Sequence, residues 1–332
     1  MRAVVLVGGF GTRLRPLTLS RPKQMLPVGN RPMIERVLGH LADHGITSAV
    51  LALGYRADGF QDAYPSGRCA GVALHYAVEP EPLGTAGAVR FAALDAGIAE
   101  PFLVLNADVL TDLDVTALIA DHQRSGAEGT LALHRVEDPS SFGVVPTDAA
   151  GRVTSFIEKP PLGEAVTDLI NAGTYVLEPS VLDRIAPDQA VSIERSTFPA
   201  MVSDGTLHAM DGDTYWIDAG TPATYLAANL DLVNGRRQPV EPGVHADAQV
   251  DGAVVGSVVG AGVHIAEAAL VSGSVVLPGA MIGAGALVQD AIIGEGASIG
   301  AGAVLDQGTV VGDEAVVPAC AHLTAVRIPE ES

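Results

Sequence analysis

The sequence predicts an α/β domain followed by a C-terminal parallel β-helix. Up to about residue 234, short apolar runs alternate with segments of helical spacing, which is typical of a mixed, mostly parallel, Rossmann-like sheet with helices on both faces. Beyond that point, aliphatic side chains recur every six positions, the period of a β-helix. Glycines number 38 and aromatic residues only 4%, a composition that favours tight turns and small-residue packing.

Three segments are expected along the 332 residues. A first domain spans residues 1–234, a linker spans 235–243, and the β-helix spans 244–332. The linker interrupts the strand and helix pattern with glycine, two arginines and two prolines. A chain of this length can bury a core without a metal or a disulfide.

The formal net charge of −20 restricts the partners of this chain. A nucleic-acid duplex would be repelled over most of the surface, so nucleic-acid binding is not expected. No apolar run approaches the roughly 18 residues of a membrane helix, and no secretory signal pattern is present. With only two cysteines, Cys69 and Cys320, the sequence predicts a cytoplasmic protein without a disulfide framework or a membrane partner.

The elements of the first domain follow from periodicity and from helix boundary signals. The helix over 33–44 has Ile34, Val37 and Leu41 on one face, and Gly45 lies just past its end. Thr221 as N-cap and Pro222 at the first helical position start the last helix. Strands are expected over 2–7, 50–53, 72–77, 102–105, 130–136 and 174–177, and helices over 33–44, 57–64, 85–95, 114–124, 192–202 and 222–233.

The C-terminal repeat consists of inward-facing aliphatic positions that are six residues apart, with a spacing of five between some blocks. It resembles the hexapeptide-repeat left-handed β-helix, in which each coil stacks on the previous one. Such flat faces suit subunit packing, so a homo-oligomer is predicted. The repeating positions are Val259, Ile265, Val271, Val276, Ile282, Val288, Ile293, Ile299, Leu305, Val311 and Val317.

A glycine-rich loop follows the first predicted strand. Gly8, Gly9 and Gly11 lack the Cβ atoms that would keep backbone N–H groups from an anion, and Arg13 follows them. Further on, Lys23 offers an ammonium after a stiffening proline. The loop is neither a dinucleotide fingerprint nor a P-loop, because a leucine replaces the third glycine and no Gly-Lys-Ser/Thr occurs. These residue types predict a polyphosphate site.

A second loop, 79–87, contains two prolines and leads into a helix. Gly84 opens that helix, whose first N–H groups are expected to be free for a base or a phosphate. The Glu79 carboxylate can only accept hydrogen bonds, so it suits the N1–H and N2–H₂ donors of guanine better than thymine or uracil. A solvated loop glutamate is the alternative interpretation.

A third loop follows the strand over 102–105. There, Asp108 stands at the carboxyl end of a buried strand, where an oxygen donor can hold Mg²⁺ against phosphates. For Asp108 considered alone, an aspartate that caps the following turn is the alternative interpretation.

Together these motifs resemble a known family. The run from Gly8 to Val28 is similar to the signature GGxGTRLxPLTxxxPKxMLPV of the sugar-1-phosphate nucleotidyltransferases, the nucleotide-sugar pyrophosphorylases, and the resemblance extends over about the first 230 residues. It implies that a nucleotidyl group passes from a nucleoside triphosphate to a sugar 1-phosphate, with Mg²⁺ as cofactor and pyrophosphate as product. GTP and mannose 1-phosphate are the expected substrates, giving GDP-mannose.

The resemblance assigns roles to individual positions of this sequence. It implies Arg13, Lys23, Asp108 and Asp218 as catalytic residues, with Asp108 and Asp218 as ligands of Mg²⁺. Asn106-Ala107-Asp108 has Ala where the family usually has Gly, which leaves the carboxylate in place. Segment 192–195 is expected to be mostly structural. Nucleotide binding is implied for Val7, Gly8, Gly9, Gly11, Thr12, Arg13, Glu79, Pro82, Gly84 and Thr85, and sugar-phosphate binding for Asn106, Gly143, Glu158, Lys159, Asn171 and Gly173.

Three alternatives stay open at this point. The same reaction could use dTTP or UTP with glucose 1-phosphate, or GTP with a heptose or cyclitol 1-phosphate. The chain could instead be a catalytically silent paralogue that binds a nucleotide sugar and regulates a partner. Acyl transfer by the β-helix is the third, since some hexapeptide domains use a histidine for it, and His245, His264 and His322 are present here.

Overall fold

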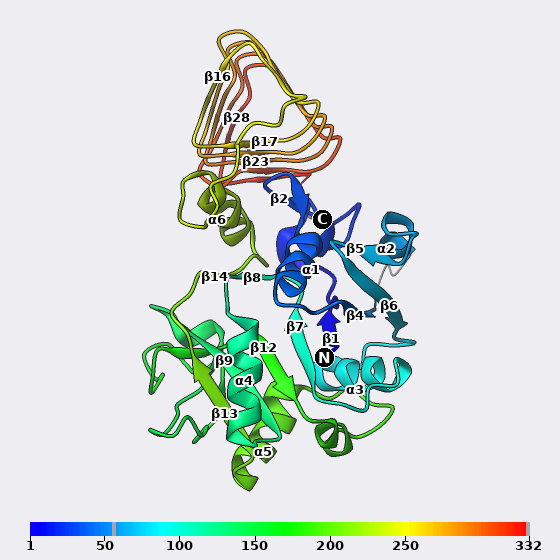
Figure 1. Cartoon of the computed structure of the whole chain (residues 1–332). Coiled ribbons are helices and arrows are strands. Elements are labelled where there is room, and N and C mark those ends of the chain that lie inside the picture. The colour runs from blue at the N-terminus through cyan, green and yellow to red at the C-terminus, as the bar shows by residue number, and fades with distance from the viewer. Residues whose placement is uncertain (55–57, 330–332) are drawn as a thin grey trace. The chain divides into compact units, whose positions relative to one another are not determined.

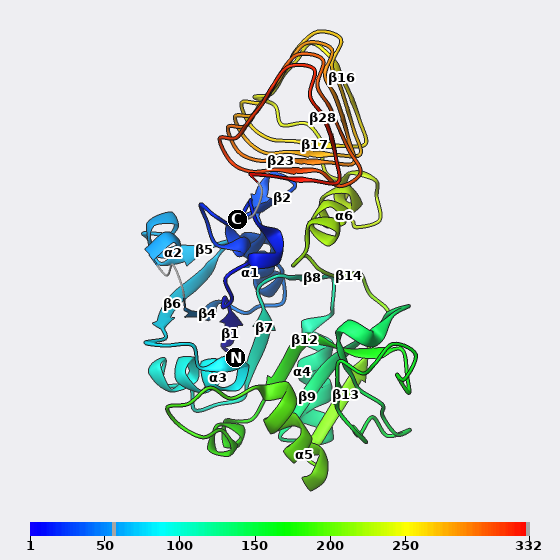
Figure 2. The same ribbon diagram turned by 180° about the vertical axis from the view of Figure 1, so that it is seen from behind.

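A computed structural model describes residues 1–54 and 58–329 of the chain. It divides into two compact units, each described here by itself. Unit 1 comprises residues 1–9 and 35–216, and unit 2 comprises residues 10–34 and 217–332. The predicted domain boundaries at residues 234 and 243 stay predictions. Figures 1 and 2 show the elements of both units from opposite sides.

Unit 1 is built on one mixed sheet. Its path is β11-β10-β12-β7-β1-β4-β6-β5, and β9 and β13 continue from β12. The centre, β6-β4-β1-β7, is parallel, and β12 joins it antiparallel through β7. The mixed sheet that the alternating pattern predicted is therefore confirmed. The strands are β1 Ala3–Leu6, β4 Ser48–Leu53, β5 Arg68–Cys69, β6 Val72–Val78, β7 Phe102–Asn106, β9 Gly129–Arg135, β10 Gly143–Val144, β11 Ile157–Glu158, β12 Leu169–Leu177 and β13 Leu207–Asp211, with β8 Val109–Thr111 outside this sheet. Strand β14 Trp216–Asp218, also outside it, begins at the last residue of unit 1 and continues in unit 2.

The helices of unit 1 lie close to their predicted positions. Helix α3 packs on β1, β4 and β6, and α4 packs on β9, β12 and β13. The segment predicted as a helix over 192–202 differs, because it starts as a π-helix, Ile193–Thr197, and continues as α5. Ala57, the predicted start of one helix, lies outside the described residues. The helices are α1 Met33–Asp43, α2 Asp58–Ala63, α3 Gly84–Asp95, α4 Val115–Ser125 and α5 Phe198–Asp204, with short 3₁₀ turns at Pro139–Ser141 and Pro179–Arg184.

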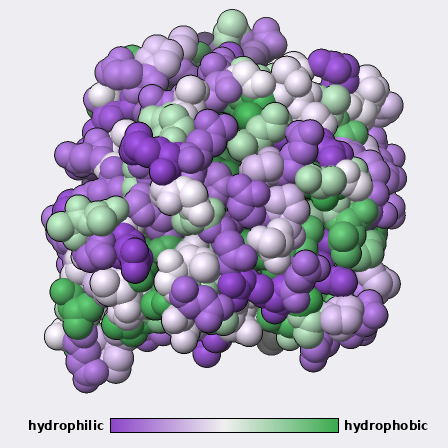
Figure 3. Space-filling view, turned by 60° about the horizontal axis from the view of Figure 1, so that its bottom comes forward, coloured by the Kyte–Doolittle hydropathy of each residue, from purple (hydrophilic) through white to green (hydrophobic). Residues whose placement is uncertain are grey.

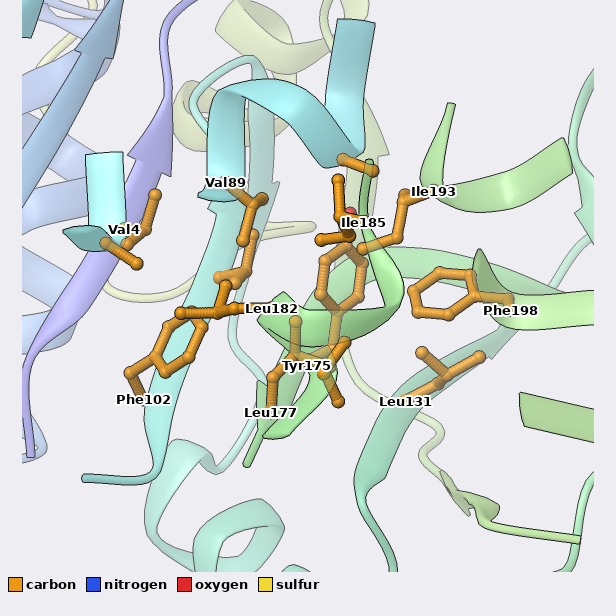
Figure 4. Close-up of a cluster of buried hydrophobic side chains, with 14 of the residues drawn as sticks. Val4, Val89, Phe102, Leu131, Tyr175, Leu177, Leu182, Ile185, Ile193 and Phe198 are labelled. Carbon is orange, nitrogen blue, oxygen red and sulfur yellow. The ribbon is translucent and has the colours of Figure 1, made fainter. Parts of the chain in front are cut away.

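The core of unit 1 lies between the sheet and helices α3 and α5 (Figure 4). Tyr175 on β12 and Phe198 at the start of α5 meet edge to face, with ring centroids 5.3 Å apart, and neither ring is exposed. Ile193 lies beside them. This packing fixes segment 191–198 against β12. On the face shown in Figure 3, hydrophilic side chains predominate and hydrophobic ones form only small groups.

Unit 2 begins with residues 10–34, which include the glycine-rich signature from residue 10 onward. Two 3₁₀ turns, Thr12–Leu14 and Lys23–Met25, are followed by the hairpin β2 Pro27–Val28 and β3 Arg31–Pro32. Helix α6 Pro222–Val233 starts at the predicted N-cap, where Thr221 and Thr224 form a reciprocal capping box. Its Asn229 is fully buried and accepts a hydrogen bond from the Gly29 N–H at 2.8 Å.

The β-helix of unit 2 consists of three parallel five-stranded sheets. Every predicted inward aliphatic position, from Val259 to Val317, is buried in one continuous core, so the predicted repeat is confirmed. The first sheet contains β15 Gln249–Val250, β18 His264–Ile265, β21 Met281–Ile282, β24 Ser298–Ile299 and β27 Val316–Val317. The second contains β16 Ala253–Val255, β19 Leu270–Ser272, β22 Leu287–Gln289, β25 Val304–Asp306 and β28 His322–Thr324. The third contains β17 Val258–Val259, β20 Val275–Val276, β23 Ile292–Ile293, β26 Val310–Val311 and β29 Arg327–Ile328.

Candidate active site

Three of the predicted motifs follow parallel strands of unit 1 at the same edge of the sheet. Gly8 and Gly9 come after β1, the segment 106–108 starts at the last residue of β7, and the loop 79–85 comes after β6. Leu6 stands in register with Asn106, and the Leu6 carbonyl accepts the Ala107 N–H at 3.1 Å. The Leu53 carbonyl, at the end of β4, accepts the Glu79 N–H at 2.8 Å. The predicted gathering of ligand loops at the carboxyl edge is therefore present.

Asn106 lies directly over Gly173 of β12. Gly173 has a φ of +75°, and a Cβ there would come within 2.7 Å of Asn106 Nδ2. Pairing of β12 with β9 shifts between Asn171 and Tyr175, so Gly173 sits in an irregular part of the strand. Within it, Asn171 Oδ1 accepts the Gly173 N–H at 3.1 Å. The structure thus brings together three of the residues predicted to bind the sugar phosphate.

Glu158 and Gly143 pair across the short strands β10 and β11. A Cβ at Gly143 would lie 3.1 Å from Glu158 Oε2, so the carboxylate lies over the glycine. Burial, and then the nearby Glu194 carboxylate, raise the pKa of Glu158, against the lowering effect of Lys159.

Lys159 is the exposed cation of this part of the site. Its Nζ lies 3.6 Å from Glu158 Oε1, and its side chain is 58% exposed. Its backbone has a φ of +52°, a left-handed conformation that costs a non-glycine residue about 1–2 kcal/mol. The Phe142 carbonyl holds the Lys159 N–H at 3.0 Å in this conformation. The Lys159 side chain is therefore open to solvent beside Glu158.

The loop 79–85 is closed by its own hydrogen bonds. Glu79 Oε2 accepts the Leu83 N–H at 3.1 Å, and burial raises the pKa of Glu79 while this hydrogen bond opposes the rise. Gly84, with a φ of +68°, leads into α3, and a Cβ there would lie 2.7 Å from the Val191 carbonyl oxygen. Both the conformation and the space therefore require glycine at this position.

One expectation for this loop is wrong in part. The first N–H groups of α3 were expected to be free for a ligand, but the Val191 carbonyl accepts the Ala86 N–H at 2.9 Å. The segment 191–194 supplies this carbonyl, because the core holds it against the helix start. A ligand at this helix terminus therefore has to use the earlier amides, those of Gly84 and Thr85.

Glu194 is a site residue that the sequence did not indicate. Its Oε2 accepts hydrogen bonds from Thr85 Oγ1 at 2.7 Å and from Ser192 Oγ at 2.6 Å, and its charge acts on Glu158. Thr85 Oγ1 in turn accepts the Ile193 N–H at 2.8 Å. In sequence, Ser192-x-Glu194 has the form of an ordinary helix start, and Ser192 does accept the Arg195 N–H as an N-cap. Segment 192–195 therefore links the predicted base loop to the predicted sugar site.

The remaining predicted residues lie in unit 2. Thr12 and Arg13 are exposed on a 3₁₀ turn whose Leu14 is fully buried. A Cβ at Gly220 would come within 2.7 Å of both Arg13 Nη2 and Asp218 Oδ1, so the guanidinium and the carboxylate flank this glycine.

Lys23 lies on the other side of the loop 11–23. A Cβ at Gly11 would come within 3.4 Å of the Lys23 Cβ, and Thr18 Oγ1 donates to the Gly11 carbonyl at 2.8 Å. Unit 2 thus holds Arg13, Lys23 and Asp218, while Asp108 belongs to unit 1. The predicted sharing of one ion by Asp108 and Asp218 stays a prediction.

The sequence predicts Mg²⁺ as the metal, and the carboxylate donors of the chain decide whether this ion fits. Within residues 1–54 and 58–329, no group of three or more His, Cys, Asp or Glu side chains is arranged to hold a metal ion. Mg²⁺ usually keeps several waters and takes one or two carboxylates together with substrate phosphates. Asp218 Oδ1 accepts the Gly220 N–H at 2.8 Å, which orients a hard oxygen donor at the start of α6. This donor chemistry fits Mg²⁺. In the part of the chain that the structure describes, no helix is both long enough and apolar enough to cross a membrane.

Comparison with known sequences gives the family of this chain. Residues 2–235 match the family described as nucleotidyl transferase, and residues 241–330 match the one described as the GMPPB C-terminal domain. The chain belongs to the nucleotidyl transferase family.

Similar proteins include one from a fungus and one from a bacterium. The mannose-1-phosphate guanyltransferase of Schizosaccharomyces pombe is 44% identical over 242 residues, which are 72% of this chain and 66% of the relative. This chain thus matches slightly less than two thirds of that relative. The mannose-1-phosphate guanylyltransferase of Mycobacterium tuberculosis is 41% identical over 79% of this chain and 76% of its own length. Among solved structures, HddC from Yersinia pseudotuberculosis complexed with GMP-PN is 30% identical, with a TM-score of 0.59 over 69% of this chain and 97% of that chain.

Proposed function

We propose that the chain is a mannose-1-phosphate guanylyltransferase, which transfers GMP from GTP to mannose 1-phosphate and releases pyrophosphate. The observation that supports it most directly is the gathering of Glu79, Asn106 and Gly173 at one edge of the sheet in unit 1. We assign Glu79, which follows β6, to the base, and Asn106, at the end of β7, and Gly173 to the sugar. The relatives named for this reaction support the choice of substrates.

The chemistry needs no protein nucleophile. An oxygen of the sugar phosphate is already an anion and attacks the α-phosphorus in line, so the protein has to hold two polyanions and balance their charge. Arg13 and the amides of Gly8 to Gly11 are assigned to the triphosphate, and Lys23 to the α-phosphate. Lys159, exposed beside Glu158, is assigned to the phosphate of the sugar.

Mg²⁺ would be held by Asp108 and Asp218 and, when bound, would neutralise charge on the triphosphate. Both aspartates are half-buried, which leaves their carboxylates within reach of a ligand. Arg13 flanks Asp218 across Gly220 and can orient that carboxylate while it contacts a phosphate. These two residues of unit 2 would therefore act as a pair.

Glu79 is assigned to selection of the base. One carboxylate oxygen, Oε2, accepts the Leu83 N–H, which fixes the plane of the group. The other oxygen, Oε1, can then accept from the donors of guanine, whereas thymine and uracil offer a mixed edge. The Asn106 amide, which both donates and accepts, is assigned to vicinal hydroxyls of the sugar.

We also infer that the chain forms homo-oligomers through its β-helix and acts in the cytoplasm. Outward residues of the third sheet, Val258, Val275, Ile292 and Val310, are all buried within unit 2, where α6 packs on β17 and β20. The other two sheets expose apolar side chains, with Val316 of the first sheet 71% exposed and Val255 of the second 58% exposed. A second copy could cover them. Light scattering behind size-exclusion chromatography should give a mass above the 33.9 kDa of one chain, and a monomer at micromolar concentration would contradict the oligomer.

Release of pyrophosphate from a panel of substrates tests the proposed reaction. GTP, dTTP, UTP and ATP are each combined with mannose, glucose, heptose and cyclitol 1-phosphates in the presence of Mg²⁺. The expected result is the highest kcat/KM with GTP and mannose 1-phosphate. A higher value for another pair would reassign the substrates. No release with any pair, together with binding of a nucleotide sugar, would instead identify a silent regulatory paralogue.

A further inference from the structure

Arg21 joins the phosphate-binding segment of unit 2 to the β-helix. It falls at one of the unspecified positions of the signature, two residues before Lys23, so the family resemblance gives it no role. Its Nη1 lies 2.6 Å from Glu295 Oε2, and its Nη2 lies 3.0 Å from Asp313 Oδ2. The Arg21 side chain is 24% exposed and that of Asp313 only 12%, so solvent screens this pair less than an open surface pair.

Asp313 is held by more than the guanidinium. Its Oδ2 also accepts a hydrogen bond from the Ser20 hydroxyl, and its Oδ1 accepts the Glu295 N–H at 2.9 Å. Next to it, a Cβ at Gly312 would come within 2.9 Å of the Pro16 Cβ, so the segment lies directly on the β-helix backbone. Three consecutive contacts, through Pro16, Ser20 and Arg21, therefore fasten this segment to one corner of the β-helix.

The sequence of that corner changes where Arg21 reaches it. Corner positions on four successive coils, two residues after the strands β17, β20, β23 and β26, are Ala261, Pro278, Glu295 and Asp313. The first two are uncharged, and the last two are acidic. Adjacent coils of a β-helix stack closely, so two neighbouring carboxylates repel each other unless a cation lies between them. Arg21 supplies that cation from a segment 274 and 292 residues away in sequence.

We propose that Arg21, Asp313 and Glu295 form a positioning clamp through which the β-helix sets the placement of Lys23 and Arg13 for the triphosphate. Pro22 has a φ of −61° and joins Arg21 rigidly to the 3₁₀ turn that starts at Lys23. Fixing Arg21 therefore fixes the Lys23 backbone. The C-terminal end of the segment has separate, uncharged attachments, since the Tyr225 hydroxyl donates to the Pro27 carbonyl and Asn229 accepts the Gly29 N–H.

The predicted effect of the clamp on turnover rests on the proposed function. The affinity for the nucleotide tests the clamp without relying on turnover. Misplacement of a catalytic group by about 1 Å can cost on the order of 10² in rate. Arg21→Met should therefore lower kcat/KM for GTP by about 10-fold to 100-fold. Arg21→Lys should lower it less, because lysine keeps the charge but lacks the planar guanidinium that binds two carboxylates at once. The KM for mannose 1-phosphate should stay within about twofold, because Lys159 and Glu158 belong to unit 1.

The test uses Arg21→Met, Arg21→Lys, Asp313→Asn and the double variant that combines Arg21→Met with Asp313→Asn. The control is Glu267→Gln, which removes one charge from an exposed turn of the same β-helix. Steady-state pyrophosphate release and the Kd of GTP with Mg²⁺, by calorimetry, are measured on full-length folded protein. The clamp is supported if Arg21→Met and Asp313→Asn raise the GTP Kd, the double variant is no worse than Arg21→Met, and the control matches the wild type.

Two results would overturn it. One is a GTP Kd and kcat/KM within twofold of wild type in both Arg21→Met and Asp313→Asn. The other is an equal rise of both substrates' KM values, which is expected if the substitution only loosens the fold. If the wild type releases no pyrophosphate with any substrate pair, the proposed function fails, and the clamp is then decided by the GTP Kd alone.

Discussion

The stretches before and after the glycines of the glycine-rich loop are held in different ways, one in each unit. In unit 1, strand β1 holds the stretch before Gly8 through a parallel ladder to β4 and β7, and Val4 and Val5 are fully buried. In unit 2, side chains hold the stretch from Pro16 to Arg21, through ion pairs and one hydroxyl contact. A backbone ladder tolerates many apolar side chains, whereas the second attachment depends on individual residues. The cationic part of the loop is therefore open to change by single substitutions far away in sequence.

Asp108→Asn in unit 1 and Lys23→Ala in unit 2 should have the largest effects. Asp108→Asn removes a carboxylate assigned to hold Mg²⁺, and Lys23→Ala removes a cation that offsets phosphate charge in the transition state, so kcat should fall by on the order of 10² or more in each variant. Asn has nearly the same shape as Asp, so Asp108→Asn is not expected to change the fold. Pyrophosphate release measures the loss. Near-normal turnover in either variant, with substrate binding intact, would refute the catalytic role assigned to the substituted residue.

Glu79→Gln tests whether unit 1 alone selects the base. Gln can both donate and accept, so the preference for GTP over UTP should fall by about 10-fold or more, since a wrongly paired polar group at a binding site costs about 1–3 kcal/mol. Ratios of kcat/KM for the two nucleotides give the measurement. Glu81→Gln, on the same exposed loop, is the matched control and should keep the wild-type ratio. An unchanged ratio in Glu79→Gln would show that Glu79 is a solvated loop residue.

Thr85→Val tests the link between the base loop and segment 191–194. It keeps the shape but removes the hydroxyl that donates to Glu194 and accepts the Ile193 N–H. A net loss of about 1–3 kcal/mol for the two hydrogen bonds predicts a KM for GTP about 10-fold higher. Thr85→Ser keeps the hydroxyl and should stay close to the wild type. Equal KM values in Val and Ser variants would make segment 191–194 purely structural.

The pH dependence of the sugar site should show the smallest effect. Because burial and Glu194 raise the pKa of Glu158, its carboxylate is lost at a higher pH than that of an ordinary glutamate. Affinity for mannose 1-phosphate should therefore fall about twofold to threefold on acidification toward that raised pKa, if the carboxylate accepts sugar hydroxyls. Glu194→Gln should move this fall to lower pH. A KM for mannose 1-phosphate that is flat over the same pH range would exclude the role.

The sign for stability is opposite to that for binding. A raised pKa in the folded state means that folding favours the protonated form, so this stabilisation is full below the pKa of the unfolded chain and is lost as pH rises through the folded pKa. Glu158→Gln should then melt at a higher temperature than the wild type at neutral pH. Differential scanning calorimetry at two pH values checks this difference.

The sequence by itself determined the two architectures, the loops at the sheet edge and the residue types in them. Periodicities of six and 3.6 residues, buried strands and glycine positions depend on local chemistry, which a single chain displays directly. Only the tertiary structure decided that Val191 occupies an amide at the start of α3, that Glu194 joins Thr85, and that Arg21 meets Asp313. These contacts join residues 105 to 292 positions apart, and their hydrogen-bonding groups have no periodicity that would reveal the partner. Such pairs form only when packing of the core brings the segments together, so the local pattern cannot predict them.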